Sequence, residues 1–275
     1  MAFTLTPLTH AIGVEVTGID LCAPLAPRDR EALENALIEH LVMVVRGQDY
    51  SAPTLLDAVG HFGVVMHQHI TPLLMEGYPQ IAVLNSRETK VGADGKFVPI
   101  GARDWHTDHA HHERPPNYTA LYAVTLPSSG GDTSFANMQR GFASLPSQIR
   151  EDLVARTVVT KIDDRYSSLE DQKKFNKPRT HPLVRTHPIT GKKAIYFHPG
   201  MVARLEGMET DASLEFLDDL LSRVITPEIS YRHKWYSGDM VICDNRSVMH
   251  IAHRDYDPAI GRVLHRILVE GETPF

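Results

Sequence analysis

The chain has 275 residues and a mass of 30.8 kDa, and we expect it to form a single domain over residues 1–275. Its 28 basic and 34 acidic residues give a net charge of −6, which excludes a protein that neutralises nucleic-acid phosphates with a dense basic stripe. No apolar stretch approaches the roughly 20 residues that cross a bilayer, and the first residues lack the pattern of a secretory signal. Its two cysteines make no disulfide framework. We therefore expect a soluble, cytoplasmic globular protein with no nucleic-acid or membrane partner.

The first sixty residues are predicted to contain both strands and helices. Alternation predicts a short strand over 12–19, helical spacing predicts a helix over 27–41, and a buried strand over 41–46 and a second helix over 53–62 follow. From residue 81 onward the chain changes to short β-rich runs between turn residues, at 81–85, 118–126, 133–138, 193–198, 229–235, 239–245 and 262–271. Two helical runs interrupt them, at 141–154 and 211–224.

The order of these elements predicts a fold that is mainly β with helices. Many short strands with inserted helices are typical of an antiparallel sandwich or barrel that carries its helices outside. A doubly wound α/β fold fits poorly, because strands and helices do not alternate regularly and no GxGxxG motif is present. We therefore expect an α+β protein with a double-stranded β-helix (jelly-roll, cupin-like) core and N-terminal and inserted helices.

The sixteen histidines cluster at 106–112, 181–198 and 250–265, so a metal site is the first chemistry to consider. In the segment RDWHTDHAHH, His106 and Asp108 are two positions apart, and on a strand both side chains would point to one face. One imidazole and one carboxylate at that spacing can reach the same cation. The pattern needs a third ligand from elsewhere in the chain.

The segment DMVICDNRSVMHIAH, residues 239–253, offers that ligand. A buried strand runs into a polar, turn-like cluster at 244–246, and His250 follows, with His253 as a competing candidate. Two histidines and one carboxylate form the facial triad of non-haem Fe(II) oxygenases. The same three ligand types also make catalytic zinc sites, so the triad alone leaves the reaction open.

Two further features suggest that an anion binds nearby. Thr133, in Gly-Gly-Asp-Thr between two predicted strands, can donate its hydroxyl to a carboxylate. Arg262 and Arg266 are four positions apart on one alternating strand, and therefore on one face. Interior guanidinium groups are costly unless anions pair with them, so this face predicts two anionic groups. The alternative is that the face lies in solvent and both arginines are ordinary surface charges.

Ordered blocks along nearly the whole chain resemble one enzyme family. WHTD (105–108), LPSSGGDT (126–133), HPLVRTHPITGKKAIYFHPG (181–200), GDMVICDNRSVMHIA (238–252) and RVLHR (262–266) resemble the taurine dioxygenase / 2,4-dichlorophenoxyacetate dioxygenase family. The opening IGVEVTGIDL (12–21) is also similar to the start of that family. Members depend on Fe(II) and 2-oxoglutarate, and they use O2 as a co-substrate.

The resemblance implies a role for each matching position. His106, Asp108 and His250 match the iron ligands, which are also the catalytic residues, while Thr133 and Arg262 match the pair that binds 2-oxoglutarate. Arg266 matches the arginine that binds the substrate anion, and His69 in MHQHITP lies near the substrate-binding histidine of the family.

The implied reaction hydroxylates a C–H bond of a small, anionic substrate and releases succinate and CO2. Sulfonates, sulfate esters, aryloxyalkanoates and amino-acid-derived acids are the candidate substrates. The segment before Trp105 lacks the asparagine-rich run of the taurine enzyme, which argues against taurine itself. Assembly into a homodimer or tetramer is a further expectation.

Two alternatives remain at this point. A zinc hydrolase, or a jelly roll that binds metal without catalysis, could use the same His/Asp/His set, although a hydrolase has no evident need for a second buried anion site beside the metal. The neighbouring His109, His111 and His112 form either a second metal patch or part of the pocket wall.

Overall fold

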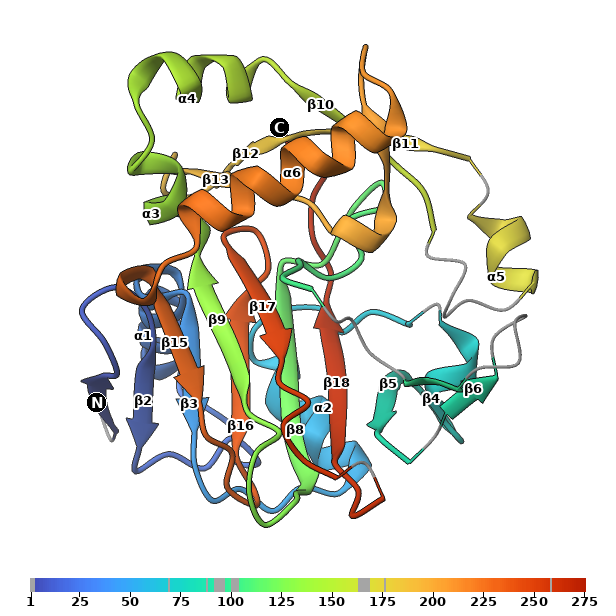
Figure 1. Ribbon diagram of the computed structural model, residues 1–275. Coiled ribbons are helices and arrows are strands. Elements are labelled where there is room, and N and C mark those ends of the chain that lie inside the picture. Colours follow the sequence, from blue (N-terminus) through green and yellow to red (C-terminus); the bar gives the residue numbers. More distant parts are fainter. Residues whose placement is uncertain are drawn as a thin grey trace.

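Two mainly antiparallel sheets with helices outside them form the centre of the protein in the computed structural model (Figure 1). The arrangement confirms the predicted α+β fold with a jelly-roll core. The structure describes residues 3–68, 70–87, 89–91, 97–99, 104–162, 169–175, 177–257 and 259–275. The predicted substrate-binding residue His69 lies outside these ranges.

The larger sheet has eight strands in the order β1-β2-β3-β16-β8-β18-β5-β4, and its neighbours are antiparallel except for β2 and β3. Its central strands are buried on both faces, which explains their nearly continuous apolar sequences. The strands are β1 (Thr4–Pro7), β2 (Val14–Thr17), β3 (Val42–Val45), β4 (Leu74–Met75), β5 (Tyr78–Asn85), β8 (Tyr118–Thr125), β16 (Met240–Asp244) and β18 (Val263–Val269).

The smaller sheet has the order β15-β9-β17, with β9 (Thr133–Asn137) between β15 (Ser230–His233) and β17 (Val248–Ala252). The β-rich pattern predicted β9 and β15, but it did not predict β17, the strand that contains His250. The segment is short and follows a tight polar turn, so its sequence alone offers little strand signal. Its pairing with β9, in which His250 lies opposite Phe135, defines it as a strand.

Two N-terminal helices pack on the outer side of the larger sheet. They are α1 (Pro27–His40) and α2 (Ala52–Gly60), close to the predicted ranges. Proline in the first turn favours the start of each helix, and Leu41 in the left-handed conformation (φ 65°) ends α1. Leu33 and Leu37 of α1 and Val59 of α2 are buried in one apolar cluster with Ile242 of β16.

The remaining elements are inserted along the chain between the strands of the two sheets. The predicted helix over 141–154 is two helices, because Pro146 caps the second helix and disfavours helical backbone at the residue before it. The helices here are α3 (Met138–Ala143), α4 (Ser147–Val154), α5 (Leu169–Lys174) and α6 (Thr210–Val224). The short strands are β6 (Thr89–Val91), β7 (Phe97–Pro99), β10 (Thr157–Thr160), β11 (Arg179–Pro182), β12 (Val184–Thr186), β13 (Lys193–Ile195) and β14 (Val202–Leu205), and the 3₁₀ helices are η1 (Thr71–Leu73), η2 (Pro199–Met201) and η3 (Pro227–Ile229).

The space between the two sheets is only partly filled by apolar side chains. Phe135, Val241 and Val248 belong to a buried cluster that both sheets contribute to. Beside this cluster the interior opens into a cavity lined by residues of both sheets. Within the part of the chain that the structure describes, no helix has the length and apolarity needed to span a membrane.

Candidate active site

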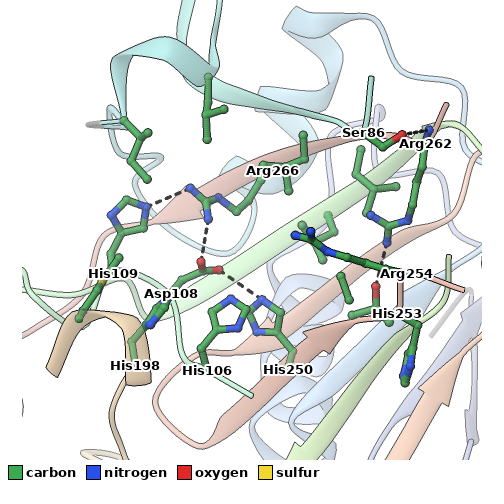
Figure 2. Close-up of a pocket in the computed structure, with 18 of the residues that line it drawn as sticks. Ser86, His106, Asp108, His109, His198, His250, His253, Arg254, Arg262 and Arg266 are labelled. Atoms are coloured by element: carbon green, nitrogen blue, oxygen red, sulfur yellow. Dashed lines mark hydrogen bonds and ion pairs between the residues drawn. The ribbon is translucent and has the colours of Figure 1, made fainter. Parts of the chain in front are cut away.

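The cavity between the sheets contains most of the predicted site residues (Figure 2). Strands β9 and β17 of the smaller sheet provide Thr133 and His250, and β18 of the larger sheet provides Arg266. His106, Asp108 and Arg262 also line the cavity from segments outside these strands.

His106, Asp108 and His250 meet at one point of the cavity wall. All three are buried, and their potential ligand atoms lie within 4.8 Å of one another. A pair of backbone hydrogen bonds joins the two histidines: the amide of His106 donates to the carbonyl of His250 (3.1 Å), and the amide of His250 donates to the carbonyl of His106 (2.8 Å). Their rings are therefore held with centroids 4.2 Å apart.

The orientation of His106 leaves one ring nitrogen for a metal. Its Nδ1 lies 2.8 Å from the carbonyl oxygen of Asp104, so Nδ1 carries the proton and donates it there. This is the usual arrangement of a metal-binding histidine, in which a hydrogen bond at one nitrogen fixes the other toward the ion. His250 presents its Nε2 to Asp108, 3.8 Å from Oδ2.

The strand argument for His106 and Asp108 is only partly correct. His106 takes part in an isolated bridge, but the chain turns immediately afterwards, and Asp108 lies in that turn. His109 then adopts the left-handed backbone conformation (φ 50°). Strand alternation therefore does not explain why the two side chains converge. Hydrogen bonds around the turn hold Asp108 in position instead.

The Asp108 carboxylate has a partner on each oxygen. The Nη1 of Arg266 donates to Oδ1 (2.7 Å), and the hydroxyl of Thr119 donates to Oδ2 (2.9 Å). Burial by itself raises the pKa of Asp108, but Arg266 and the neighbouring imidazoles outweigh it and hold the pKa well below its usual value. Burial and the nearby His106 lower the pKa of His250 to about 3. The cluster thus holds an ionised carboxylate and a neutral imidazole, the forms that bind metals.

His253, the competing candidate, does not join this cluster. Its Nε2 lies 2.7 Å from the hydroxyl of Ser134, on the smaller sheet. Among the residues that the structure describes, His250 belongs to a group whose geometry could hold a metal ion, and His253 does not.

Arg262 and Thr133 form a second polar centre in the cavity. The guanidinium donates from Nε to the carbonyl of Gly131 (2.7 Å) and from Nη2 to Thr133 Oγ1 (3.0 Å). Trp235 Nε1 also donates to this hydroxyl (3.0 Å), so both acceptor positions of Thr133 are filled and its own proton remains to be donated. No described carboxylate forms an ion pair with Arg262, and burial lowers the pKa of its guanidinium to about 10. The pair presents a cation and a hydroxyl donor to an anion.

Arg266 is also buried, which excludes the solvent-exposed alternative for both arginines. In addition to its contact with Asp108, it donates from Nε (3.2 Å) and Nη2 (3.0 Å) to Gln68 Oε1, and from Nη2 to His109 Nε2 (3.0 Å). The sequence predicts that a bound ligand provides the anionic partner of Arg266. That expectation is incomplete, because the carboxylate of Asp108 is already such a partner. Of the five N–H groups of a guanidinium, four have protein acceptors here.

The second histidine group lies directly beside Arg266. The potential ligand atoms of His109, His111 and His112 also lie within 4.8 Å of one another. However, the Nε2 of His109 accepts a hydrogen bond from Arg266, and His109 and His111 line the cavity. These contacts favour the pocket-wall interpretation over a second metal patch.

Sequence reasoning missed several residues that support the site. Gln68 was adjacent to a named candidate and Asn245 lay in a polar turn, but no short pattern indicated what either would contact. The same holds for Thr119, a threonine on a buried strand. His198, in the histidine-rich block, lines the cavity with its ring 4.7 Å from that of His106.

Comparisons with known proteins identify the family. A model of the "Taurine catabolism dioxygenase TauD, TfdA family" matches residues 4–268. The chain belongs to this family. It is 31% identical to the alpha-ketoglutarate-dependent sulfate ester dioxygenase of Pseudomonas putida, over 98% of this chain and 89% of the relative. It is 29% identical to the pentalenolactone F synthase of Streptomyces avermitilis, over 96% of this chain and 92% of the relative.

A solved structure shows the same fold. A taurine dioxygenase from Burkholderia xenovorans superimposes with a TM-score of 0.82 at 25% identity, covering 100% of this chain and 91% of that one. Members of the TauD, TfdA family are oxidoreductases, and this chain is accordingly a 2-oxoglutarate-dependent dioxygenase that consumes O2.

We predict that His106→Ala, Asp108→Ala and His250→Ala each abolish tight binding of a divalent metal while the protein stays folded. Each change removes one of three potential ligands that converge on one point. Titration of the metal-free protein with Co(II), followed by its visible spectrum, measures the affinity, and circular dichroism checks the fold. His253→Ala is the control and should bind metal like the wild type. Loss of binding in that control, with binding retained in His250→Ala, would show that the wrong histidine was assigned.

Proposed function

We propose that the enzyme holds Fe(II) with His106, Asp108 and His250, holds 2-oxoglutarate with Thr133 and Arg262, and hydroxylates a C–H bond of a small anionic substrate. Succinate and CO2 are the co-products. The observation that carries this proposal is the buried Arg262–Thr133 pair, which has no carboxylate partner among the described residues and shares one cavity with the three potential metal ligands.

The donor set supports iron as the metal. Two neutral imidazoles and one carboxylate are the facial triad of non-haem Fe(II) oxygenases, which leaves open positions for other ligands. Membership of a dioxygenase family decides against the zinc hydrolase and the non-catalytic alternative. When bound, the iron would supply the redox chemistry through which O2 oxidises 2-oxoglutarate and the substrate.

The residues of the chain orient the reactants around that centre. Arg262 offers a charge, and Thr133 offers the proton of its hydroxyl, so together they suit the distal carboxylate of 2-oxoglutarate. Trp235 stabilises this arrangement, since it donates to Thr133 and its ring lies 5.9 Å from the Arg262 guanidinium.

The charge of the cavity supports an anionic substrate. Three arginines line it, Arg254, Arg262 and Arg266, whereas Asp108 is the one acidic residue among the described residues that do so. With a divalent metal and the two carboxylates of 2-oxoglutarate in place, the cavity still has an excess of positive charge. We propose that the remaining N–H of Arg266 and this excess charge bind a sulfonate, a sulfate ester or a carboxylate.

Part of the cavity wall is apolar and suits the body of such a substrate. Ile70, Leu73 and Leu84 lie there together with Met201. A substrate with an anionic group on an apolar carbon skeleton therefore fits both parts of the wall, and a sulfate ester is one such class.

The cytoplasmic location, the role of His69 and assembly into a homo-oligomer stay predictions.

We predict that Arg262→Ala weakens 2-oxoglutarate binding by roughly 10–150-fold, because a hydrogen bond to a charged group contributes about 1.5–3 kcal/mol. Anaerobic titration of the Fe(II) protein with 2-oxoglutarate, followed by its visible charge-transfer band, measures the midpoint. Arg46→Ala is a control for the loss of an arginine side chain, because Arg46 pairs with Glu15 and Asp239 away from the cavity. An unchanged midpoint in Arg262→Ala would remove this residue from the proposed role.

We predict that Arg266→Ala retains the visible band with Fe(II) and 2-oxoglutarate but loses most substrate-coupled succinate formation. The substrate anion loses its donor, so the remaining turnover becomes uncoupled from substrate oxidation. Succinate and oxidised product are quantified together for sulfonates, sulfate esters and carboxylates. Loss of the band itself would contradict a substrate role and would indicate that Arg266 acts on the metal centre through Asp108.

A further inference from the structure

Asn245 connects two parts of the site through its side chain. It lies in the turn between β16 and β17, five positions before His250, and is fully buried. Its Oδ1 accepts from the backbone amide of Asp108 (2.7 Å) and faces the hydroxyl of Thr107 (2.8 Å). Its Nδ2 donates to the carbonyl of Asp108 (3.0 Å) and to that of Pro116 (3.0 Å). Asn245 thus binds both the N–H and the C=O of Asp108.

These contacts replace the backbone pairing that Asp108 lacks. His106 is placed by its paired hydrogen bonds with His250, but Asp108 lies beyond that bridge in a turn. A buried backbone amide and carbonyl without partners would cost free energy, and the loop would relax to satisfy them. Asn245 provides both partners at once, and it does so from the turn that leads into β17, the strand that carries His250.

We propose that Asn245 is a positioning residue for the metal centre, which fixes the backbone of Asp108 so that its carboxylate faces His106 and His250. This role rests on the metal site proposed above at His106, Asp108 and His250, but it does not depend on the metal being iron, because it applies to any divalent ion in this cluster. The side chain of Asn245 does not line the cavity. Its effect acts through Asp108, as a hydrogen-bonding partner behind a metal ligand does.

Two substitutions test this role. Asn245→Ala removes all the side-chain hydrogen bonds. Asn245→Asp keeps the shape and the acceptor for the Asp108 amide, but it places a carboxylate oxygen against the carbonyls of Asp108 and Pro116. We expect each to raise the dissociation constant for Co(II) or Mn(II) by roughly 10–100-fold, the usual effect of losing such a partner. If Asn245→Ala does not fold, Asn245→Asp gives the answer.

Asn137→Ala is a matched control. Asn137 is also a buried asparagine whose amide joins two backbone segments, since it donates to the carbonyl of Ala11 (2.8 Å) and accepts from the amide of Arg140 (3.0 Å). Its loss should lower the melting temperature while leaving the metal dissociation constant and the visible Co(II) spectrum unchanged. In Asn245→Asp the spectrum should change as well, because the Asp108 ligand is displaced.

The measurements separate the possible failures, with His106→Ala included as the variant that lacks a ligand. If both Asn245 variants melt at lower temperature, as Asn137→Ala does, but bind Co(II) like the wild type, Asn245 is structural only and the proposal is wrong. The iron site proposed above would still stand, provided that His106→Ala binds poorly. If His106→Ala binds Co(II) like the wild type, both the site and the positioning role are overturned.

Discussion

The site depends on one negative charge, the carboxylate of Asp108, buried between two sheets. A buried charge is tolerated only when it is paired and hydrogen-bonded. Arg266 supplies the opposite charge, and the hydroxyl of Thr119 supplies a second donor from the neighbouring strand. Because Oδ2 is the oxygen nearer to the ring of His250, the contact of Arg266 with Oδ1 leaves Oδ2 facing the potential metal position. The interactions that stabilise the buried charge therefore also set the orientation of the carboxylate.

Arg262 and Arg266 show how two similar residues four positions apart come to differ. Both guanidinium groups are buried in the same cavity. Arg266 has a carboxylate, an amide oxygen and an imidazole around it, so the protein itself satisfies most of its donors. Arg262 has a carbonyl and a hydroxyl, and both acceptors are neutral. A charge that the protein leaves unpaired is the stronger indication of a ligand, which makes Arg262 the better-supported anion site of the two.

The sequence predicted the fold class and most of the strands of the two central sheets, because strand periodicity and turn residues are local signals. It missed β17, whose five residues become a strand only through pairing with β9. It named His106, Asp108 and His250, but the reason that it gave for Asp108, strand alternation, does not hold in the turn. The contacts made by Gln68 and Asn245 could not be predicted, since they join residues more than a hundred positions apart and no local pattern encodes them.

The cavity residues proposed to act in the reaction and those that form much of the apolar wall come from different parts of the fold. Thr133, His250 and Arg266 lie on strands that are hydrogen-bonded to neighbouring strands within the two central sheets. Much of the apolar wall comes instead from segments inserted outside those sheets, at Ile70, Leu73, Ile162 and Met201. Inserted segments tolerate change in length and sequence better than paired strands do. The same chemistry can therefore be kept while the wall is altered, as expected for a fold whose functions differ at the site and not in the framework.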